Sequence, residues 1–183
     1  MALAAALSNS RAATPRTLSV ASAFSSGVQT MMPKGMGISA PVTTSLIDSG
    51  ALRLALRPWF ELDRVLVDAP CTGLGALRRR PEARWRRQPS DVAPLARLQR
   101  ELLTAALSLV RPGGVVAYVV CSPHLAETVG VVADVVRRTE VEWLDAREFF
   151  PGVPDLGDGP SVQLWPHKHG TDAMFCSLLR RPA

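Results

Sequence analysis

The sequence has no long apolar run and few cysteines. Its longest uninterrupted apolar stretch, Val115–Cys121, is far shorter than the ~20 residues that a membrane-spanning helix needs, so we expect no membrane partner. The three cysteines, Cys71, Cys121 and Cys176, form no CxxC pair, which argues against a disulfide framework and a ribbon-type zinc site. A reducing compartment, and hence a cytoplasmic location, is the expectation.

Acidic residues are almost absent from the start of the chain. Residues 1–60 carry five basic residues and one acid, Asp48, whereas the formal net charge of the whole 183-residue chain is +5. The first 50 residues are also rich in Ser, Thr and Ala and show no sustained apolar periodicity, so we predict that residues 1–57 form a disordered leader. Because this composition is also typical of an organelle transit peptide, organelle targeting remains an alternative location.

Residues 58–183 have the composition and periodicity of a folded α/β domain. The chain is 47% hydrophobic and 20% charged, which excludes a wholly disordered protein. Continuous runs of apolar residues predict strands, and apolar residues three and four positions apart predict helices. Because the predicted strands and helices alternate along the chain, we expect a parallel sheet covered by helices. The expected strands are 64–67, 115–120 and 141–144, with 162–165 and 173–179 pairing around 167–172. One expected helix is capped by Ser90 and Asp91, has apolar positions from Leu95 to Leu109 and is stopped by Pro112; the second covers 125–138.

Reactive side chains follow two of the expected strands. Asp68 and Cys71 come directly after strand 64–67, and Cys121 follows strand 115–120. Ligands of open α/β sheets bind beyond the carboxyl ends of the strands. If the two strands are neighbours, both thiols and the carboxylate converge on one crevice.

Four segments around these residues carry a recognisable pattern. They are Asp68-Ala-Pro-Cys-Thr-Gly-Leu-Gly75, Arg79-Arg80-Pro-Glu-Ala-Arg-Trp85, Val119-Val-Cys-Ser122 with Glu127 beyond it, and Leu164-Trp-Pro-His-Lys-His-Gly-Thr-Asp172 followed by Met174-Phe175. In this order they resemble the motifs of the RsmB/Nop/Sun-type RNA (cytosine-5) methyltransferases, most closely the bacterial 16S ribosomal RNA branch. The resemblance covers about residues 58–181.

The resemblance implies an activity and a set of site residues. It implies a Rossmann-like fold that uses S-adenosyl-L-methionine to methylate the 5-position of a cytosine in RNA, with ribosomal RNA as the expected substrate. It assigns the nucleophile that attacks the 6-position to Cys121, the elimination of the product to Cys71, and the base and cofactor contacts to Asp68 and Pro70. A stacked cytosine is out of reach of a thiolate, so the base must be single-stranded or flipped out.

An arginine-rich segment follows the first motif. Arginine forks pair with phosphates and an aromatic ring offers a stacking face, so we interpret the segment as an RNA contact, with a solvated basic loop as the alternative. Its members are Arg78, Arg79, Arg80, Arg84, Trp85, Arg86 and Arg87.

Other interpretations have less support. His167 and His169 near Cys176 offer too few ligands for zinc, so no metal is expected, and Cys121 beside His124 is a weak indication of a hydrolase. Nothing in residues 1–60 matches the Gly-rich cofactor loop of the family; Gly35-Met-Gly37 is too short a pattern. We therefore expect the C-terminal part of a catalytic domain, with its first strands missing and the edge of strand 64–67 exposed. A non-catalytic RNA-binding remnant is the alternative function.

Overall fold

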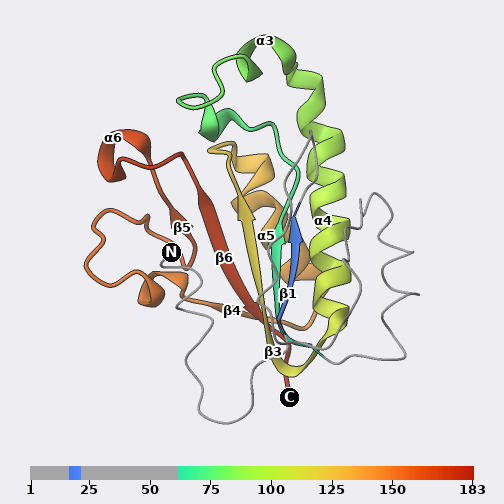
Figure 1. The fold of residues 1–183 in the computed structure, drawn as a ribbon. Helices are drawn as coiled ribbons and strands as arrows, with labels where there is room; N and C mark the ends of the chain where they lie inside the picture. Colours follow the sequence, from blue (N-terminus) through green and yellow to red (C-terminus); the bar gives the residue numbers. More distant parts are fainter. Residues whose placement is uncertain (1–16, 22–61) are drawn as a thin grey trace, which may run out of the picture.

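A mixed β-sheet with two helices on one face organises the described part of the chain (Figure 1). The computed structural model describes residues 17–21 and 62–183. The strands are β1 (Thr17–Ala21), β2 (Leu62–Asp68), β3 (Val110–Val120), β4 (Glu142–Leu144), β5 (Val162–Gln163) and β6 (Phe175–Arg180). The α-helices are α3 (Ala83–Arg86), α4 (Val92–Leu109), α5 (Val129–Arg138) and α6 (Pro166–His169). The 3-10 turns are η1 (Leu74–Ala76), η2 (Pro89–Asp91), η3 (Leu125–Glu127) and η4 (Ala146–Phe149).

The sheet order is β1-β2-β3-β6-β4, and β5 also pairs with β6. β1, β2 and β3 run parallel, whereas β6 lies antiparallel between β3 and β4. The predicted parallel arrangement is confirmed for β2 and β3, whereas the antiparallel insertion of β6 between β3 and β4 was not predicted. The hairpin-like pairing of β5 with β6 is confirmed.

The two faces of the sheet are buried against different partners. Val116, Tyr118 and Val120 of β3 pack with α4 and α5 in one core cluster. Ala117 and Val119 point to the opposite face, where they pack with residues of η4 and of the segment that leads to β5. Because side chains alternate along a strand, burial on both faces requires the continuous apolar run that β3 shows.

The start of β3 contains Pro112 and two glycines, which interrupt the apolar pattern of the sequence. Helix α4 ends at Leu109, as Pro112 and the glycines after it predict. These residues lie inside β3, however, where the pairing with β2 jumps from Leu62–Val110 to Arg64–Val115. The extra residues form a bulge, so the apolar run 115–120 stays in register with β2.

Two helix starts differ from the prediction. The expected helix 125–138 begins with η3, and α5 starts only at Val129, because the backbone of Thr128 (φ −114°, ψ −109°) leaves the helical region. The carboxylate of Asp91 accepts a bond from the backbone N–H of Gln88 at 3.0 Å instead of capping α4.

Strand β1 lies on the edge of β2 that the sequence predicted to be exposed. Its parallel pairing runs from Thr17–Arg64 to Ala21–Asp68, and it satisfies the backbone groups on that side of β2. The expectations of an unpaired edge and of disorder throughout the leader therefore fail at these residues. The rest of the predicted leader, and Gly35 and Gly37, lie outside the described residues. None of the described helices has the length and the apolar character to cross a membrane.

Candidate active site

The carboxyl ends of β2 and β3 lie side by side, as the candidate site requires. Asp68, the last residue of β2, is in register with Val119, and the backbone N–H of Ala69 donates to the carbonyl of Val119 at 3.0 Å. The two chains then leave the sheet in loops that carry Cys71 and Cys121. The predicted convergence of both thiols and the Asp68 carboxylate at one edge of the sheet is confirmed.

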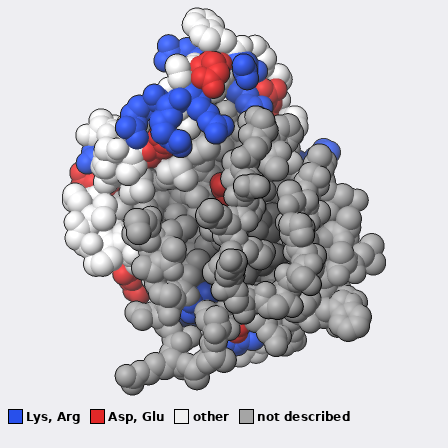
Figure 2. Space-filling model, viewed as in Figure 1, with Lys and Arg blue, Asp and Glu red and all other residues white. Residues whose placement is uncertain are grey.

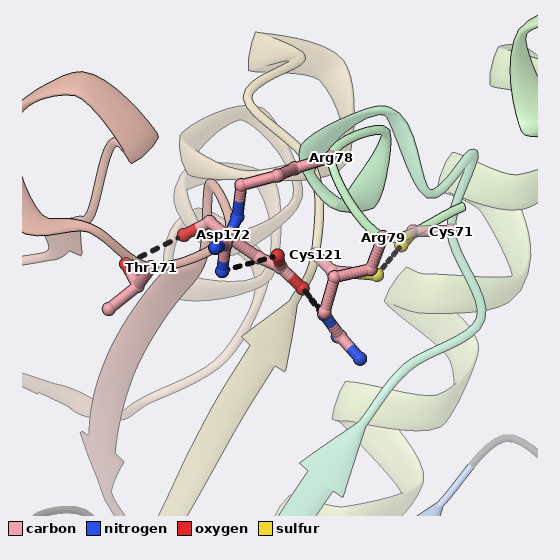
Figure 3. A network of polar contacts seen from close by, with 6 residues as sticks. All are labelled: Cys71, Arg78, Arg79, Cys121, Thr171 and Asp172. Carbon is pink, nitrogen blue, oxygen red and sulfur yellow. Dashed lines mark hydrogen bonds and ion pairs between the residues drawn. The ribbon is translucent and has the colours of Figure 1, made fainter. Parts of the chain in front are cut away.

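The two thiols form a hydrogen-bonded pair. Cys71 Sγ and Cys121 Sγ are 3.4 Å apart, both cysteines are free, and Cys71 is buried whereas Cys121 is half-buried (Figure 3). The hydrogen bond from Cys71 lowers the pKa of Cys121 to about 7, against the opposing effect of burial. The same bond, together with burial, raises the pKa of Cys71 far above its usual value. The pair therefore shares one proton near neutral pH, with the proton on Cys71 and the thiolate on Cys121.

This pairing predicts the pH dependence of alkylation by iodoacetamide. Because only the thiolate reacts, the rate at Cys121 should rise with pH through a midpoint near 7, where its pKa lies. Cys176, which is buried in β6 with a pKa raised to about 12 by desolvation, serves as an unreactive internal control. Peptide mass spectrometry after a pH series measures both sites. A midpoint near 9, the ordinary thiol value, in the native chain would contradict the thiol pairing.

Among the described residues, none donates a hydrogen bond to the carboxyl of Asp68. The Asp68 side chain is exposed at the end of β2. The surrounding protein nevertheless removes enough water to raise the pKa of its carboxyl. Pro70 is half-buried beside it, and the carbonyl of Pro70 accepts a bond from Gln99 Nε2 at 2.8 Å. The carboxyl is thus available to a ligand at this edge of the sheet.

A buried carboxylate that sequence reasoning left without a role lies beneath the thiols. Glu127 is fully buried and accepts hydrogen bonds from Thr72, Ser122 and Gln99. In the sequence, only its place six residues after Cys121 points to Glu127. Its contacts could not be predicted, because two of its partners are 28 and 55 residues away along the chain.

A glycine brings the first cysteine loop against the second one. After Cys71 the chain turns at Gly73, whose φ of 73° favours glycine, and enters η1. The N–H of Gly75 donates to the carbonyl of Cys121, and the carbonyl of Gly75 accepts from the N–H of Ala173, both at 2.9 Å. The Cys71 loop is therefore held between the end of β3 and the Gly170-Thr-Asp172 segment.

The carboxylate of Asp172 contacts two members of the arginine-rich segment. This buried carboxylate accepts bonds from Nε of Arg79, at 2.7 Å, and from Nη2 of the same residue, and Nη2 of Arg78 lies 3.6 Å away. Figure 3 shows both guanidinium groups directed toward this carboxylate, beside Cys121. The Arg79 bond lowers the pKa of Asp172. Arg78 and Arg79 are thus already paired within the site, which the sequence did not indicate.

The remaining arginines are exposed at one end of the molecule. The side chains of Arg80, Arg84 and Arg86 make no hydrogen bond or ion pair with any described residue, and Arg87 Nη2 lies 3.5 Å from the carbonyl of Cys71. Trp85, on α3 among them, is 80% exposed. Figure 2 shows the basic side chains gathered at the top of the view, where Figure 1 places α3.

The late histidines lie on a helix. His167 and His169 belong to α6, not to a strand face, and His169 Nδ1 accepts from the N–H of Trp165 at 2.8 Å while its Nε2 contacts the carbonyl of Pro154 at 2.9 Å. Within residues 17–21 and 62–183, no group of three or more His, Cys, Asp or Glu side chains could hold a metal ion.

Comparison with known proteins places this site in a family. Over 120 residues, which are 65% of this chain and 26% of the relative, the chain is 74% identical to a Mycobacterium tuberculosis protein named as a methyltransferase. It is 36% identical over 119 residues to ribosomal RNA small subunit methyltransferase B of an Enterobacter species, again covering 65% of this chain and 26% of the relative. The chain thus spans about a quarter of the length of these relatives.

A solved structure and a protein family agree with these relatives. NSun6 from Pyrococcus horikoshii, crystallised with SFG, superposes with a TM-score of 0.60 at 31% identity and covers 72% of this chain and 33% of that one. Residues 39–180 match the family described as 16S rRNA methyltransferase RsmB/F, which confirms the resemblance of the four motifs. The chain therefore belongs to the RsmB/F family of 16S rRNA methyltransferases and has the Rossmann-like methyltransferase fold.

Proposed function

We propose that this chain carries the catalytic cysteines of an enzyme that methylates the 5-position of a cytosine in RNA, with ribosomal RNA as the substrate. The observation that carries the proposal is the thiol pair at the carboxyl ends of β2 and β3, in which Cys71 lowers the pKa of Cys121 to about 7. The family to which the chain belongs supports both the methyl transfer and the RNA substrate. A cytoplasmic location fits the bacterial relatives.

Cys121 would act as a covalent catalyst. Its thiolate adds to the 6-position of the cytosine, and the ring electrons that this addition releases make the 5-position nucleophilic enough to take a methyl group. In the elimination, the proton on the 5-position passes to water, the ring double bond re-forms, and the electrons of the carbon–sulfur bond return to Cys121. Cys71, whose sulfur lies 3.4 Å away, assists by donating a hydrogen bond to the departing thiolate.

Asp68 would hold the Watson–Crick edge of the base. Desolvation raises the pKa of its carboxyl, which favours the protonated form that donates to the ring nitrogen N3 while the other oxygen accepts from the amino group N4. The proton donated to N3 balances the charge that the thiolate brings into the ring, and it returns to the Asp68 carboxylate during the elimination. Asp68 is therefore the residue that couples recognition of cytosine to the addition step.

The same edge of the sheet fits the methyl donor. S-adenosylmethionine supplies an electrophilic methyl group when bound, and NSun6 was crystallised with one of its analogues. Ligands of this fold bind beyond the carboxyl ends of the parallel strands, where Asp68 and Pro70 lie. No described residue donates to the Asp68 carboxyl, which suits a ligand rich in hydrogen-bond donors, so we assign the cofactor contacts of the described residues to Asp68 and Pro70.

RNA contact through the exposed arginines predicts a change in salt dependence. Replacing Arg80, Arg84 and Arg86 together with alanine should weaken RNA binding and reduce the slope of log K against log salt by about 2, because each phosphate contact to a single strand contributes about 0.7. Fluorescence anisotropy with labelled RNA over a salt series measures the slope. The matched control replaces Arg137 and Arg138, which pair with Asp134 on α5. An equal effect of both variants would contradict a localised RNA surface.

Trapping on modified RNA tests the proposed reaction. The chain is incubated with S-adenosylmethionine and an RNA that contains 5-fluorocytosine, in which fluorine blocks the elimination. A complex that survives denaturation and maps to Cys121 supports the proposal. Salt-dependent RNA binding without any adduct would overturn it and would identify the chain as the alternative, a non-catalytic RNA-binding module.

A further inference from the structure

In both cysteine loops, the residue after the cysteine carries a hydroxyl group that binds the same carboxylate. Cys71 is followed by Thr72 and Cys121 by Ser122, and both hydroxyls donate to the same carboxylate oxygen, Oε2 of Glu127, at 2.5 and 2.7 Å. The backbone N–H of Thr72 donates to the other oxygen, Oε1, at 2.8 Å. One carboxylate thus bridges the two loops through the residues that directly follow the thiol pair.

The carboxylate is itself fixed from two further directions. Gln99 of α4 donates to Oε1 at 3.2 Å, and from the same Nε2 to the carbonyl of Pro70. The hydroxyl of Tyr118 donates to the backbone carbonyl of Glu127 at 2.7 Å. Glu127, Gln99 and Tyr118 are all fully buried. A buried carboxylate costs several kcal/mol unless hydrogen bonds compensate it, and here four donors do so.

We propose that Glu127 is a positioning residue whose carboxylate clamps the two cysteine loops together at the spacing that lets the Cys71 thiol hydrogen-bond to Cys121. The side-chain hydrogen bond between two sulfur atoms is lost once they separate by much more than 4 Å. The loops leave different strands, 50 residues apart, so their distance is not set by local chain geometry. The pairing of β2 with β3 ends at Ala69 and Val119, and beyond it the clamp joins the loops together with the bond from Gly75 to Cys121.

Charged side chains around the thiols also affect the ionisation of Cys121. Asp68 at the end of β2 and Asp172 before β6 both oppose ionisation of Cys121, while the Arg79 guanidinium lies close enough to interact with its thiolate. Glu127 acts on the other member of the pair, because its charge adds to the raised pKa of Cys71. The clamp therefore both brings the thiols together and keeps the proton on Cys71.

Alkylation of Cys121 as a function of pH tests the clamp in the intact chain. In Glu127→Gln and Glu127→Ala, the midpoint should move from about 7 toward the ordinary value near 9. The rate at pH 7 should then fall about fivefold, less than the thiolate fraction alone implies, because thiolate nucleophilicity rises with pKa. The matched control is Glu140→Gln, an exposed acid outside the site. A midpoint that stays near 7 in a folded Glu127 variant overturns the proposal.

A double-mutant comparison separates positioning from a general structural role. In a Cys71→Ala background the hydrogen bond to Cys121 is already gone, so Glu127→Gln should leave the Cys121 midpoint unchanged. Its effect on thermal stability should persist in that background. An equal midpoint shift with and without Cys71 would show that Glu127 acts on Cys121 by another route and would refute the clamp.

A milder variant keeps the test decisive if Glu127 variants fail to fold. Ser122→Ala removes one hydroxyl of the clamp on the Cys121 side and should raise the midpoint by at least half a pH unit; no change counts against the proposal. The inference rests on the proposed function only for the role of Cys121 as nucleophile. Since alkylation needs neither RNA nor cofactor, a failed clamp and a failed methyl transfer give different results.

Discussion

Cys121→Ala is expected to abolish the covalent RNA adduct completely, whereas Cys71→Ala is expected to make the adduct persist even on unmodified cytosine. Without the Cys121 sulfur there is no atom to add to the 6-position of the base. Without Cys71 the adduct still forms, but the departing thiolate loses the hydrogen bond that it receives across 3.4 Å. Denaturing electrophoresis of the chain with RNA and S-adenosylmethionine, with both fluorinated and ordinary cytosine, measures the two effects.

Cys176→Ala is the control for these cysteine substitutions. Cys176 belongs to β6 and packs with the cluster on the face of the sheet opposite to α4 and α5, so its loss should leave the adduct unchanged. An adduct that survives in Cys121→Ala and disappears in Cys71→Ala would reverse the assignment of the two thiols. Their pKa values argue against that reversal, because Cys71 is the proton donor of the pair.

The proximity of the Cys71 and Cys121 thiols could be predicted from the local sequence. The runs that became β2 and the end of β3 are continuous and apolar, which marks strands buried on both faces, and each ends in a reactive residue. Parallel neighbours place such ends at the same edge of the sheet. The position of β6 between β3 and β4 could not be predicted in this way, because an apolar run does not reveal the direction or order of strand pairing.

The roles of Glu127 and Asp172 depend on contacts that local patterns do not record. Glu127 joins Thr72, Gln99 and Ser122, and Asp172 binds Arg79, which lies 93 residues earlier in the chain. In the sequence, Glu127 is marked only by its place six residues after Cys121, and Arg79 is one more member of a basic cluster. Only the fold distinguishes the arginines that pair with Asp172 in the site from those that stay exposed.

Gly75→Ala is expected to destabilise the chain and to disturb the thiol pair at the same time. An added Cβ would lie 2.0 Å from the carbonyl oxygen of Ala173 and 2.8 Å from the carbonyl carbon and oxygen of Cys121. All three are backbone atoms, so no side-chain rotation relieves the contact. Overpacking of this kind costs about 3 kcal/mol, which corresponds to a fall in Tm of roughly 10 °C for a chain of this size.

The effect on the thiol pair depends on the direction in which the Cys71 loop moves. The Cβ can be accommodated only if the Cys71 loop moves away from the end of β3, which breaks the bond from Gly75 N–H to the Cys121 carbonyl and separates the thiols. We therefore expect the alkylation midpoint of Cys121 to rise together with the fall in Tm measured by circular dichroism. Gly159→Ala is the matched control, since a Cβ there meets nothing within 4 Å and the backbone carries no positive φ. A Gly75→Ala chain with an unchanged Tm, or one with a lower Tm but a midpoint still near 7, would show that this contact does not hold Cys121 beside Cys71.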